Sequence, residues 1–228
     1  MLIPAAGSGV RLGAHLPKTL IDLAGRPMFV RAADSLVRHP LCIETVIAAP
    51  AGFEEYYLEA AGKAWADYDV RVVTGGRTRQ ESVTFALRSL QQDSDAILIH
   101  DAARPFITPD VIERVLAALM AGDTAALPGL PVTDTLKRVA TDSRLVDSTV
   151  DRHDLMAVQT PQGLRRDAAQ TAFDRATRDG LDGTDDVWLI EHYRLGSIRV
   201  VDGAPRNFKI TTPEDLARAR ELLAYDTH

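Results

Sequence analysis

The chain has 228 residues, 46% of them hydrophobic and 25% charged, which suffices for one large α/β domain with a substantial core. Lysine and arginine total 26 and aspartate and glutamate total 32, so the formal net charge is −6. Proteins that bind nucleic acid generally carry a basic excess, and this balance argues against that class. It leaves an anionic small substrate open, because local clusters of charge matter more than the sum.

Cysteine usage and hydropathy narrow the class further. One cysteine, Cys42, is present, so neither an intramolecular disulfide nor a CxxC metal site can form. No apolar run reaches the length that spans a bilayer. The first residues lack the basic start and apolar core of a signal peptide. We therefore expect a cytoplasmic protein with neither a membrane nor a nucleic acid as partner.

Short β-prone runs alternate with segments of helical periodicity in the first half of the chain. The predicted strands are residues 2–5, 45–49, 70–73 and 96–100, and the predicted helices are residues 27–38, 53–64, 80–90 and 109–119. This alternation predicts a mostly parallel sheet with helices on both faces. Thr108 before Pro109 has the pattern of an N-cap followed by the first helical residue.

The pattern changes after residue 121. Residues 131–158 are polar and β-prone without a helical stripe, which predicts an extended hairpin inserted into the domain. The other predicted elements are strands at 124–127 and 197–201, helices at 167–177 and 185–193, and a last helix from Pro213 capped by Thr212. With no internal repeat and no linker, we expect a single domain over residues 1–228 with a β-arm at about 131–158.

The stretch PAAGSGVRLGAHLPK, residues 4–18, follows the first predicted strand. The dinucleotide fingerprint GxGxxG requires glycine where this chain has Leu12, and the P-loop pattern also fails. A glycine-rich turn remains, at the carboxyl end of a strand, where open α/β sheets bind ligands. Its backbone N–H groups would form an anion-binding concavity, to which Arg11 and Lys18 would add full charges. A plain tight turn needs no cation at either end, so the pattern favours a phosphate site.

Further polar stretches follow other predicted strands. HDAARPF, residues 100–106, offers Asp101 to a metal or a ribose hydroxyl and Arg104 to a phosphate. A structural cap and an ion pair explain these two residues equally well. We interpret His100 as a packed strand residue rather than a general base. NFKITTPEDL, residues 207–216, places Lys209 in a run that should lie inside, which is unusual.

TGGRTRQESV, residues 74–83, again ends a strand and opens a helix. Gly75 and Gly76 permit close backbone approach to a ligand, and Ser82 would lie in the first turn of the helix, where its hydroxyl could reach a base edge. Taken alone, Ser82 is better explained as an ordinary small residue of that turn. The same holds for Arg152, which on a polar arm would normally be a solvated charge.

In this order the motifs resemble those of the 2-C-methyl-D-erythritol 4-phosphate cytidylyltransferase family. The matching stretches run from residue 4 to residue 216 and are PAAGSGVRLG, PK, GGRTRQES, HDAARPF, PVTDTLKR, TVDR, QTPQ, DGTDD and NFKITTPEDL. The resemblance implies a Rossmann-like nucleotidyltransferase fold of the α/β class, with a protruding β-arm that exchanges with a second subunit in a homodimer. Thr19 after PK and Trp188 after DDV depart from the family's usual residues and put only loop packing in doubt.

The resemblance also implies the reaction. CMP passes from CTP to 2-C-methyl-D-erythritol 4-phosphate, which gives 4-diphosphocytidyl-2-C-methyl-D-erythritol and pyrophosphate in the non-mevalonate route to isoprenoid precursors. Mg²⁺ or another divalent cation is required. The attacking phosphate is already ionised at neutral pH, so we expect no general base, and cations with the metal would stabilise in-line attack on the α-phosphate.

Residue roles are implied in the same way. The catalytic cations would be Arg11, Lys18, Arg152 and Lys209. CTP would contact Pro4, Ala5, Ala6, Gly7, Ser8, Gly9, Gly75, Gly76, Ser82, Asp101, Ala102 and Arg104. The acceptor would contact Thr135, Arg152, Thr160, Thr184 and Lys209, with Thr135 and Arg152 reaching in from the arm of a second subunit. Asp101 is the expected metal neighbour.

Three alternatives remain open at this point. A ribitol phosphate cytidylyltransferase would share the nucleotide site and differ in the acceptor pocket. A glycosyltransferase would carry a DxD motif at the end of a strand, whereas residues 93–95 precede one. A non-catalytic nucleotide-binding regulator could keep the glycines and lose Arg11 or Lys18, and both are present.

Overall fold

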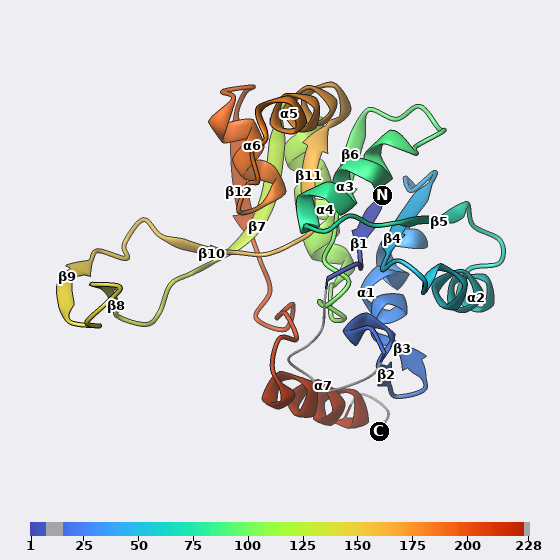
Figure 1. The fold of residues 1–228 in the computed structure, drawn as a ribbon, viewed down its shortest axis with the longest axis horizontal. Helices are drawn as coiled ribbons and strands as arrows, with labels where there is room; N and C mark the ends of the chain where they lie inside the picture. The colour runs from blue at the N-terminus through green and yellow to red at the C-terminus, as the bar shows by residue number, and fades with distance from the viewer. Residues whose placement is uncertain (8–15, 226–228) are drawn as a thin grey trace.

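An eight-stranded mixed sheet forms the centre of the molecule (Figure 1). The structure is a computed structural model and describes residues 1–7 and 16–225. The strands follow the order β10-β7-β11-β6-β1-β4-β5, and β12 pairs with β7. Their bounds are β1 (Leu2–Pro4), β4 (Thr45–Ala49), β5 (Val70–Thr74), β6 (Ala96–Ile99), β7 (Ala125–Pro131), β10 (Met156–Val158), β11 (Gln162–Arg165) and β12 (Ile198–Asp202).

Most of the sheet is parallel, as predicted. β1 pairs in parallel with β4 and β6, β4 with β5, and β12 with β7, whereas β11 runs antiparallel to both β6 and β7. The carboxyl ends of β1, β4, β5 and β6 therefore meet at one edge. The chain leaves β1 for β4 and β5 on one side and returns to β6 on the other, so its direction across the sheet switches between β1 and β6. Open α/β sheets bind ligands at such a switch point.

Helices cover both faces of the sheet (Figure 1). Leu2 and Val46 lie in one core cluster with residues of α3, α5 and α6, and their sequence neighbours Ile3 and Ile47 lie in another with residues of α1 and α2. Burial of both faces explains why these strands are continuously apolar rather than alternating. The helices are α1 (Met28–Val37), α2 (Glu54–Ala64), α3 (Arg79–Arg88), α4 (Pro109–Met120), α5 (Arg166–Asp179), α6 (Asp186–His192) and α7 (Pro213–Tyr225).

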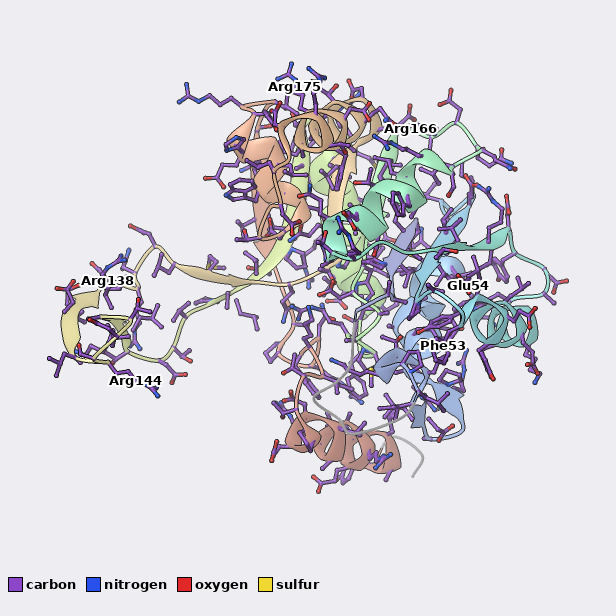
Figure 2. All side chains as sticks on the ribbon, viewed as in Figure 1. Phe53, Glu54, Arg138, Arg144, Arg166 and Arg175 are labelled. Atoms are coloured by element: carbon purple, nitrogen blue, oxygen red, sulfur yellow. The ribbon has the colours of Figure 1, made fainter. Side chains whose placement is uncertain are left out.

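A two-stranded hairpin projects away from the sheet, within the residues predicted to form an arm (Figure 1). It consists of β8 (Leu136–Val139) and β9 (Val146–Val150), and Arg138 and Arg144 lie on it (Figure 2). At the base of the hairpin, β7 extends beyond the predicted strand at 124–127. It continues to Pro131 and pairs there with Met156 of β10. From Ala125 to Gly129, β7 also pairs with β12, which the short apolar run at 124–127 did not reveal.

Two short features were not predicted from the sequence. One is β11, four residues long, whose first residue Gln162 is polar and 2% exposed. The other is a small hairpin of β2 (Asp22–Leu23) and β3 (Arg26–Pro27), which follows the 3₁₀ helix η2 (Lys18–Leu20). Among the described residues, no helix is long and apolar enough to cross a membrane.

Helix caps test the predicted boundaries. Thr212 accepts a hydrogen bond from Asp215 N at 3.2 Å, which confirms the predicted cap of α7. The Thr108 side chain, in contrast, makes no capping hydrogen bond to α4. Thr78, which was not predicted as a cap, accepts a hydrogen bond from Glu81 N at 3.1 Å, and Glu81 reaches back to Arg77 N at 2.6 Å. This arrangement resembles a capping box and starts α3 at Arg79, one residue before its predicted beginning.

We expect Thr78→Ala to lower the free energy of unfolding by about 1 kcal/mol, the usual effect of losing an N-cap acceptor. The measurement is urea unfolding followed by circular dichroism. Thr108→Ala is the matched control, because Thr108 occupies an N-cap position without the capping bond. An equal loss in both variants would contradict the assignment of the cap to Thr78.

Candidate functional site

A cleft of about 350 Å³ opens where β1 and β6 end, at the switch point of the sheet. This volume lies within the range of ligand-binding pockets, about 300–1,000 Å³. Its lining residues are Pro4, Ala5, Ala6, Gly7, Lys18, Thr19, Arg79, Ser82, Asp101, Ala102, Ala103, Lys209 and Thr211. The cleft thus gathers residues from four separate stretches of the chain, all of which contain residues predicted to form the site.

The backbone beside the cleft is built by close packing of two glycine-containing segments. Ala5 N donates to Ala48 O at 2.9 Å, and Gly75 N donates to Ala49 O at 2.7 Å. Both segments are therefore hydrogen-bonded to the carboxyl end of β4, one on each side. A Cβ atom on Gly75 would lie 2.4 Å from the Cβ of Ala6, too close for any side chain there. Glycine is therefore required at position 75 because the two segments touch.

The Ser82 hydroxyl holds this loop in place. It accepts a hydrogen bond from Gly76 N at 3.0 Å and donates one to Thr78 O at 2.9 Å. A hydroxyl has one hydrogen and two lone pairs, so these bonds leave a single lone pair to accept from a ligand. Gly75 and Gly76 also line a neighbouring depression, which shares Ala6 with the cleft.

Asp101 is the one acidic residue that lines the cleft in the described part of the chain, and three cations surround it. Its carboxylate accepts from Arg79 Nε at 3.0 Å and from Lys209 Nζ at 2.9 Å, and Arg104 Nε lies 3.7 Å away. Burial alone would raise the pKa of this carboxyl, but Arg79 and Lys209 hold the pKa well below its ordinary value. Asp101 is therefore ionised at every pH at which the protein would work.

Arg79 was not predicted as a site residue, yet it lines the cleft. Besides Asp101, its guanidinium contacts both carboxylate oxygens of Asp186, at 2.8 and 2.7 Å. Burial alone would lower the pKa of Arg79, but Asp186 and Asp101 outweigh burial and raise this pKa. The capping pattern T-x-x-E at 78–81 is the sequence signal that could have found it, because it places Arg79 at the start of a helix that faces the cleft.

His100 is a packed residue without exposed surface, which confirms the interpretation of the sequence. Its Nε2 lies 3.2 Å from Arg104 O, which must accept, so Nδ1 accepts from the Thr160 hydroxyl at 2.9 Å. That hydroxyl also accepts from Asp101 N at 3.1 Å. Burial lowers the pKa of His100 to about 4, so the imidazole is neutral. Thr160, predicted to contact the acceptor, is only 4% exposed and uses its hydroxyl to orient Asp101.

The predicted cations are only partly brought together. Lys18 donates to Ile210 O and Lys209 contacts Asp101, so both lie in the cleft. Arg104 is predicted to contact CTP, yet its side chain is 12% exposed and donates to Asn207 O at 2.8 Å, which fastens the segment that precedes Lys209. Arg11 lies outside the described residues, as do Ser8 and Gly9.

The remaining predicted acceptor contacts do not line the cleft in this chain. Thr135 and Arg152 belong to the arm, and Arg152 donates to Thr133 O within it. Thr184 is exposed in the loop between α5 and α6. None of these three residues is among those that line the cleft. A single chain therefore presents the predicted nucleotide side of the site without the residues that were predicted to come from a second subunit.

A metal held by protein alone does not fit the cleft. Within residues 1–7 and 16–225, no three or more His, Cys, Asp or Glu side chains form a group that could hold a metal ion. Asp101 is a single carboxylate, and three cations already share it. Mg²⁺ is also bound through one or two carboxylates together with substrate phosphates, and that mode is compatible with one ionised Asp101.

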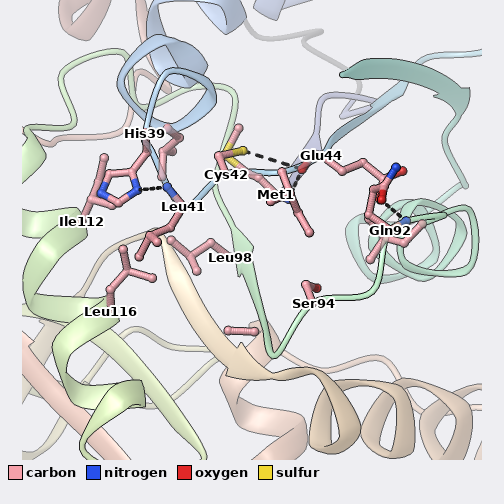
Figure 3. A pocket seen from close by; sticks show the side chains of 14 residues that line it. Met1, His39, Leu41, Cys42, Glu44, Gln92, Ser94, Leu98, Ile112 and Leu116 are labelled. Atoms are coloured by element: carbon pink, nitrogen blue, oxygen red, sulfur yellow. Dashed lines mark hydrogen bonds between the residues drawn. The ribbon is translucent and has the colours of Figure 1, made fainter. Parts of the chain in front are cut away.

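A separate pocket of about 70 Å³ lies at the opposite edge of the sheet, beside the amino ends of β1, β4 and β6 (Figure 3). Much of its lining is apolar, and several of its polar groups are engaged within the protein. His39 Nδ1 accepts from Leu41 N at 3.2 Å, and the Glu44 carboxylate accepts from Gln92 N at 3.0 Å. This pocket offers no cluster of charge to a phosphate, and we assign the functional site to the larger cleft.

The fold and the charged cleft at its switch point define an α/β enzyme of the nucleotidyltransferase class. Residues 1–225 match the model of the IspD family, which is described as 2-C-methyl-D-erythritol 4-phosphate cytidylyltransferase. The chain belongs to this family. It transfers a cytidylyl group from CTP to 2-C-methyl-D-erythritol 4-phosphate, a step of isoprenoid biosynthesis. The resemblance seen in the sequence is thereby confirmed for family, fold class and reaction.

Individual relatives agree with this membership. The 2-C-methyl-D-erythritol 4-phosphate cytidylyltransferase of Frankia casuarinae is 41% identical over 98% of this chain and 80% of its own. The protein of that name from Rhodococcus jostii is 41% identical over 100% of this chain and 96% of its own. The crystal structure of 4-diphosphocytidyl-2C-methyl-D-erythritol synthase from Anaerococcus prevotii is 28% identical, with a TM-score of 0.84 and coverage of 98% of this chain and 96% of the other.

The buried neutral imidazole predicts a pH dependence of stability. An unfolded histidine titrates near pH 6.5 and the folded His100 near 4, so the unfolded chain binds more protons between these values. The contribution of His100 is complete above about pH 6.5 and is lost as pH falls toward 4, by up to about 3 kcal/mol at 1.36 kcal/mol for each pKa unit. Urea unfolding at a series of pH values measures this change in the free energy of unfolding.

His100→Gln is expected to flatten the fall in unfolding free energy over this window. His153→Gln is the control, because His153 lies on the arm with 86% of its side chain exposed, and it should keep the wild-type slope. The same slope in His100→Gln and in the wild-type protein would show that His100 does not resist protonation.

Proposed function

We propose that CTP binds in the cleft at the β1–β6 switch point, with its base against the glycine loops and its phosphates beside the cations. The observation that carries this proposal is that Lys18 and Lys209 line one cleft together with a single carboxylate, Asp101, on a chain of net charge −6. Such local focusing of positive charge suits a polyanionic substrate. Pro4, Ala5, Ala6, Gly7 and Ala102 supply the cleft's remaining nucleotide contacts in this proposal.

Cytosine recognition in this proposal uses backbone groups and the Ser82 hydroxyl. The remaining lone pair of Ser82 can accept a hydrogen bond from an amino group, which is what the exocyclic amine of cytosine offers. Gly75 and Gly76 present backbone without side chains beside Ala6, so a small base can approach closely. In this proposal a purine, which is larger, would collide with these backbone groups, so the site selects the pyrimidine.

For the transfer step we propose electrostatic stabilisation without a general base. An oxygen of the acceptor phosphate forms a bond to the α-phosphorus of CTP, and the bond to the bridging oxygen breaks, so that pyrophosphate leaves with the electron pair. No proton has to move, because a phosphate monoester is largely ionised at pH 7. Lys18, together with Arg11, stabilises the charge that develops on the transferred phosphate and the leaving group.

Lys209 and Arg152 position the acceptor phosphate in this proposal, with Thr135, Thr160 and Thr184 around the rest of the acceptor. A divalent cation, Mg²⁺ in the first instance, would be held mainly by the triphosphate, with Asp101 as its single candidate carboxylate among the residues that line the described cleft. Such an ion neutralises charge on the phosphate oxygens when it is bound. Arg104 contributes by keeping Asp101 and the segment before Lys209 in place.

We also propose a homodimer formed through the arm of a single-domain chain. The hairpin β8–β9 carries the large apolar side chains Val139, Leu145 and Val146, which are 48, 70 and 61% exposed. Apolar groups at the tip of a projecting hairpin are suited to bury against another protein surface. The single unpaired cysteine fits a reducing compartment, and we propose the cytoplasm as the location.

Lys18→Ala is expected to lower the turnover number with CTP and methylerythritol phosphate by a factor of about 10² or more, the range for loss of one electrostatic contact to the transition state. CTP should still bind. Steady-state release of pyrophosphate measures turnover, and calorimetry measures the dissociation constant of CTP. Unchanged turnover in Lys18→Ala would contradict the role of this cation.

Lys63→Ala is the matched control, because Lys63 lies on α2 in an exposed pair with Glu59 and should leave turnover unchanged. The wild-type protein serves a second purpose in the same assay. Turnover with ribitol phosphate and none with methylerythritol phosphate would overturn the acceptor assignment and leave the nucleotide site intact.

The exchange of arms predicts complementation between two inactive variants. Each site would take Lys18 from one subunit and Arg152 from the other, so Lys18→Ala and Arg152→Ala subunits mixed in equal amounts should form dimers with one intact site. We expect recovery of about one quarter of wild-type activity, because half of the dimers are mixed and each has one site of two. Failure to recover, in a mixture shown to exchange subunits, would place Arg152 in the site of its own chain.

A further inference from the structure

Arg79 connects the nucleotide side of the cleft to the acceptor side through two carboxylates. It begins α3, three residues after Gly76. Its Nε contacts Asp101 at the end of β6, and its two Nη atoms contact Asp186, the first residue of α6. The three contacts are 3.0, 2.8 and 2.7 Å long. One guanidinium therefore fixes three elements relative to one another.

The geometry requires an arginine. The guanidinium is planar and presents its donors in a fixed fork, which matches a carboxylate through two parallel hydrogen bonds and leaves Nε for another acceptor. A lysine would bring the same charge on one nitrogen and could not satisfy Asp186 in this bidentate way while holding Asp101. Asp186 is 2% exposed, so its charge depends on this partner.

On one side, the network reaches Lys209 through Asp101. Lys209 Nζ lies 2.9 Å from Asp101 Oδ2, and Arg79 occupies the other oxygen of the same carboxylate. Lys209 is the more exposed of the two cations, with 42% of its side chain accessible against 32% for Arg79. Arg79 thus sets the orientation of the carboxylate that places the Lys209 ammonium group.

On the other side, the network fixes the loop that carries Thr184. Asp186 ends this loop, and Gln80, the neighbour of Arg79, holds its beginning by donating to Leu181 O at 2.6 Å and accepting from Gly183 N at 2.7 Å. Two consecutive residues at the start of α3 therefore fasten the loop of residues 181–186 at both ends. Lys209 and Thr184 are both acceptor-contacting residues in the proposed function.

The nucleotide loop is held by other means. Gly76 N and Thr78 O bond to the Ser82 hydroxyl, and Gly75 N bonds to Ala49 O, so none of these contacts uses the Arg79 side chain. Loss of the guanidinium fork would leave the proposed cytosine contacts in place and would change the positions of Asp101 and Asp186, through which Arg79 reaches Lys209 and the 181–186 loop.

We propose that Arg79 is a positioning residue that acts through Asp101 and Asp186 to place Lys209 and the 181–186 loop for the acceptor phosphate. The proposal rests on the proposed function, because it takes Lys209 and Thr184 as acceptor contacts. It adds a residue whose effect falls on the acceptor rather than on CTP.

The test is a separate determination of the constants for the two substrates in Arg79→Lys. We expect the KM for methylerythritol phosphate to rise about 10-fold or more, the range for losing a supporting contact around a site. The dissociation constant of CTP, from calorimetry, should change less than about twofold in the same variant. Arg88→Lys is the matched control, because Arg88 lies on the same helix in a surface pair with Asp174 at 3.3 Å, and it should leave both constants unchanged.

Two more variants separate positioning from stability. Asp186→Asn keeps Arg79 and removes the buried charge, and it should raise the acceptor KM in the same way. Asp186→Glu added to Arg79→Lys lengthens the carboxylate toward the shorter cation and should restore part of the acceptor KM. Equal weakening of CTP and acceptor, no change in either constant, or loss of the folded state in both single variants would overturn the proposal. If the wild-type protein does not turn over methylerythritol phosphate, the proposed function fails instead.

Discussion

The ionised carboxylate of Asp101, enclosed by Arg79, Arg104 and Lys209, is the interaction that organises the site. A buried carboxylate is costly unless cations and hydrogen bonds compensate for lost water, and here they do so from three separate stretches of the chain. The same compensation places the cations. Each cation is held at a definite distance from one fixed charge, so the positions of these cations are set by the protein itself.

The fold determines where this carboxylate stands. Asp101 directly follows His100 at the end of the short strand β6, and its backbone N–H is fixed by Thr160 from the segment that leads into β11. β11 runs antiparallel between β6 and β7, so the strand pairing that interrupts the parallel sheet also supplies the hydroxyl that orients the acidic residue. The neutral His100 completes this support, because its acceptor nitrogen holds the Thr160 hydrogen. The position of Asp101 at the edge of the sheet therefore depends on the buried side chains of Thr160 and His100.

Much of the architecture is predictable from local sequence, since continuous apolar runs and helical stripes report burial directly. β1, β4, β5 and β6 follow from such runs, and the polar, β-prone segment indicates a projecting hairpin. β11 was missed because it is short and starts with Gln162, whose burial is explained by the backbone N–H groups of Asp186 and Val187 that it binds. Pairing with distant partners, and not local propensity, makes it a strand.

Some site residues, too, could be identified from the sequence, and others could be identified only from the structure. Lys18, Asp101 and Lys209 stand in motifs whose composition is unusual for a buried or turn segment, so they could be selected from sequence. Arg79 could not be selected by its charge alone, because its meaning depends on Asp186, which lies 107 residues further along the chain. Thr160 and Arg104 were assigned to ligands from the sequence, and the structure adds that both support Asp101. Motifs identify which residues belong near the site, and contacts show which of them hold another residue in place.

The most direct test of this account is a crystal structure of the protein with CTP and methylerythritol phosphate bound. We predict the cytosine between Ala6 and Gly75 near the Ser82 hydroxyl, the triphosphate beside Lys18, and Asp101 still in contact with Arg79. Nucleotide bound away from the β1–β6 edge, or an Asp101 carboxylate released from Arg79 in the complex, would contradict the central role of that ion network.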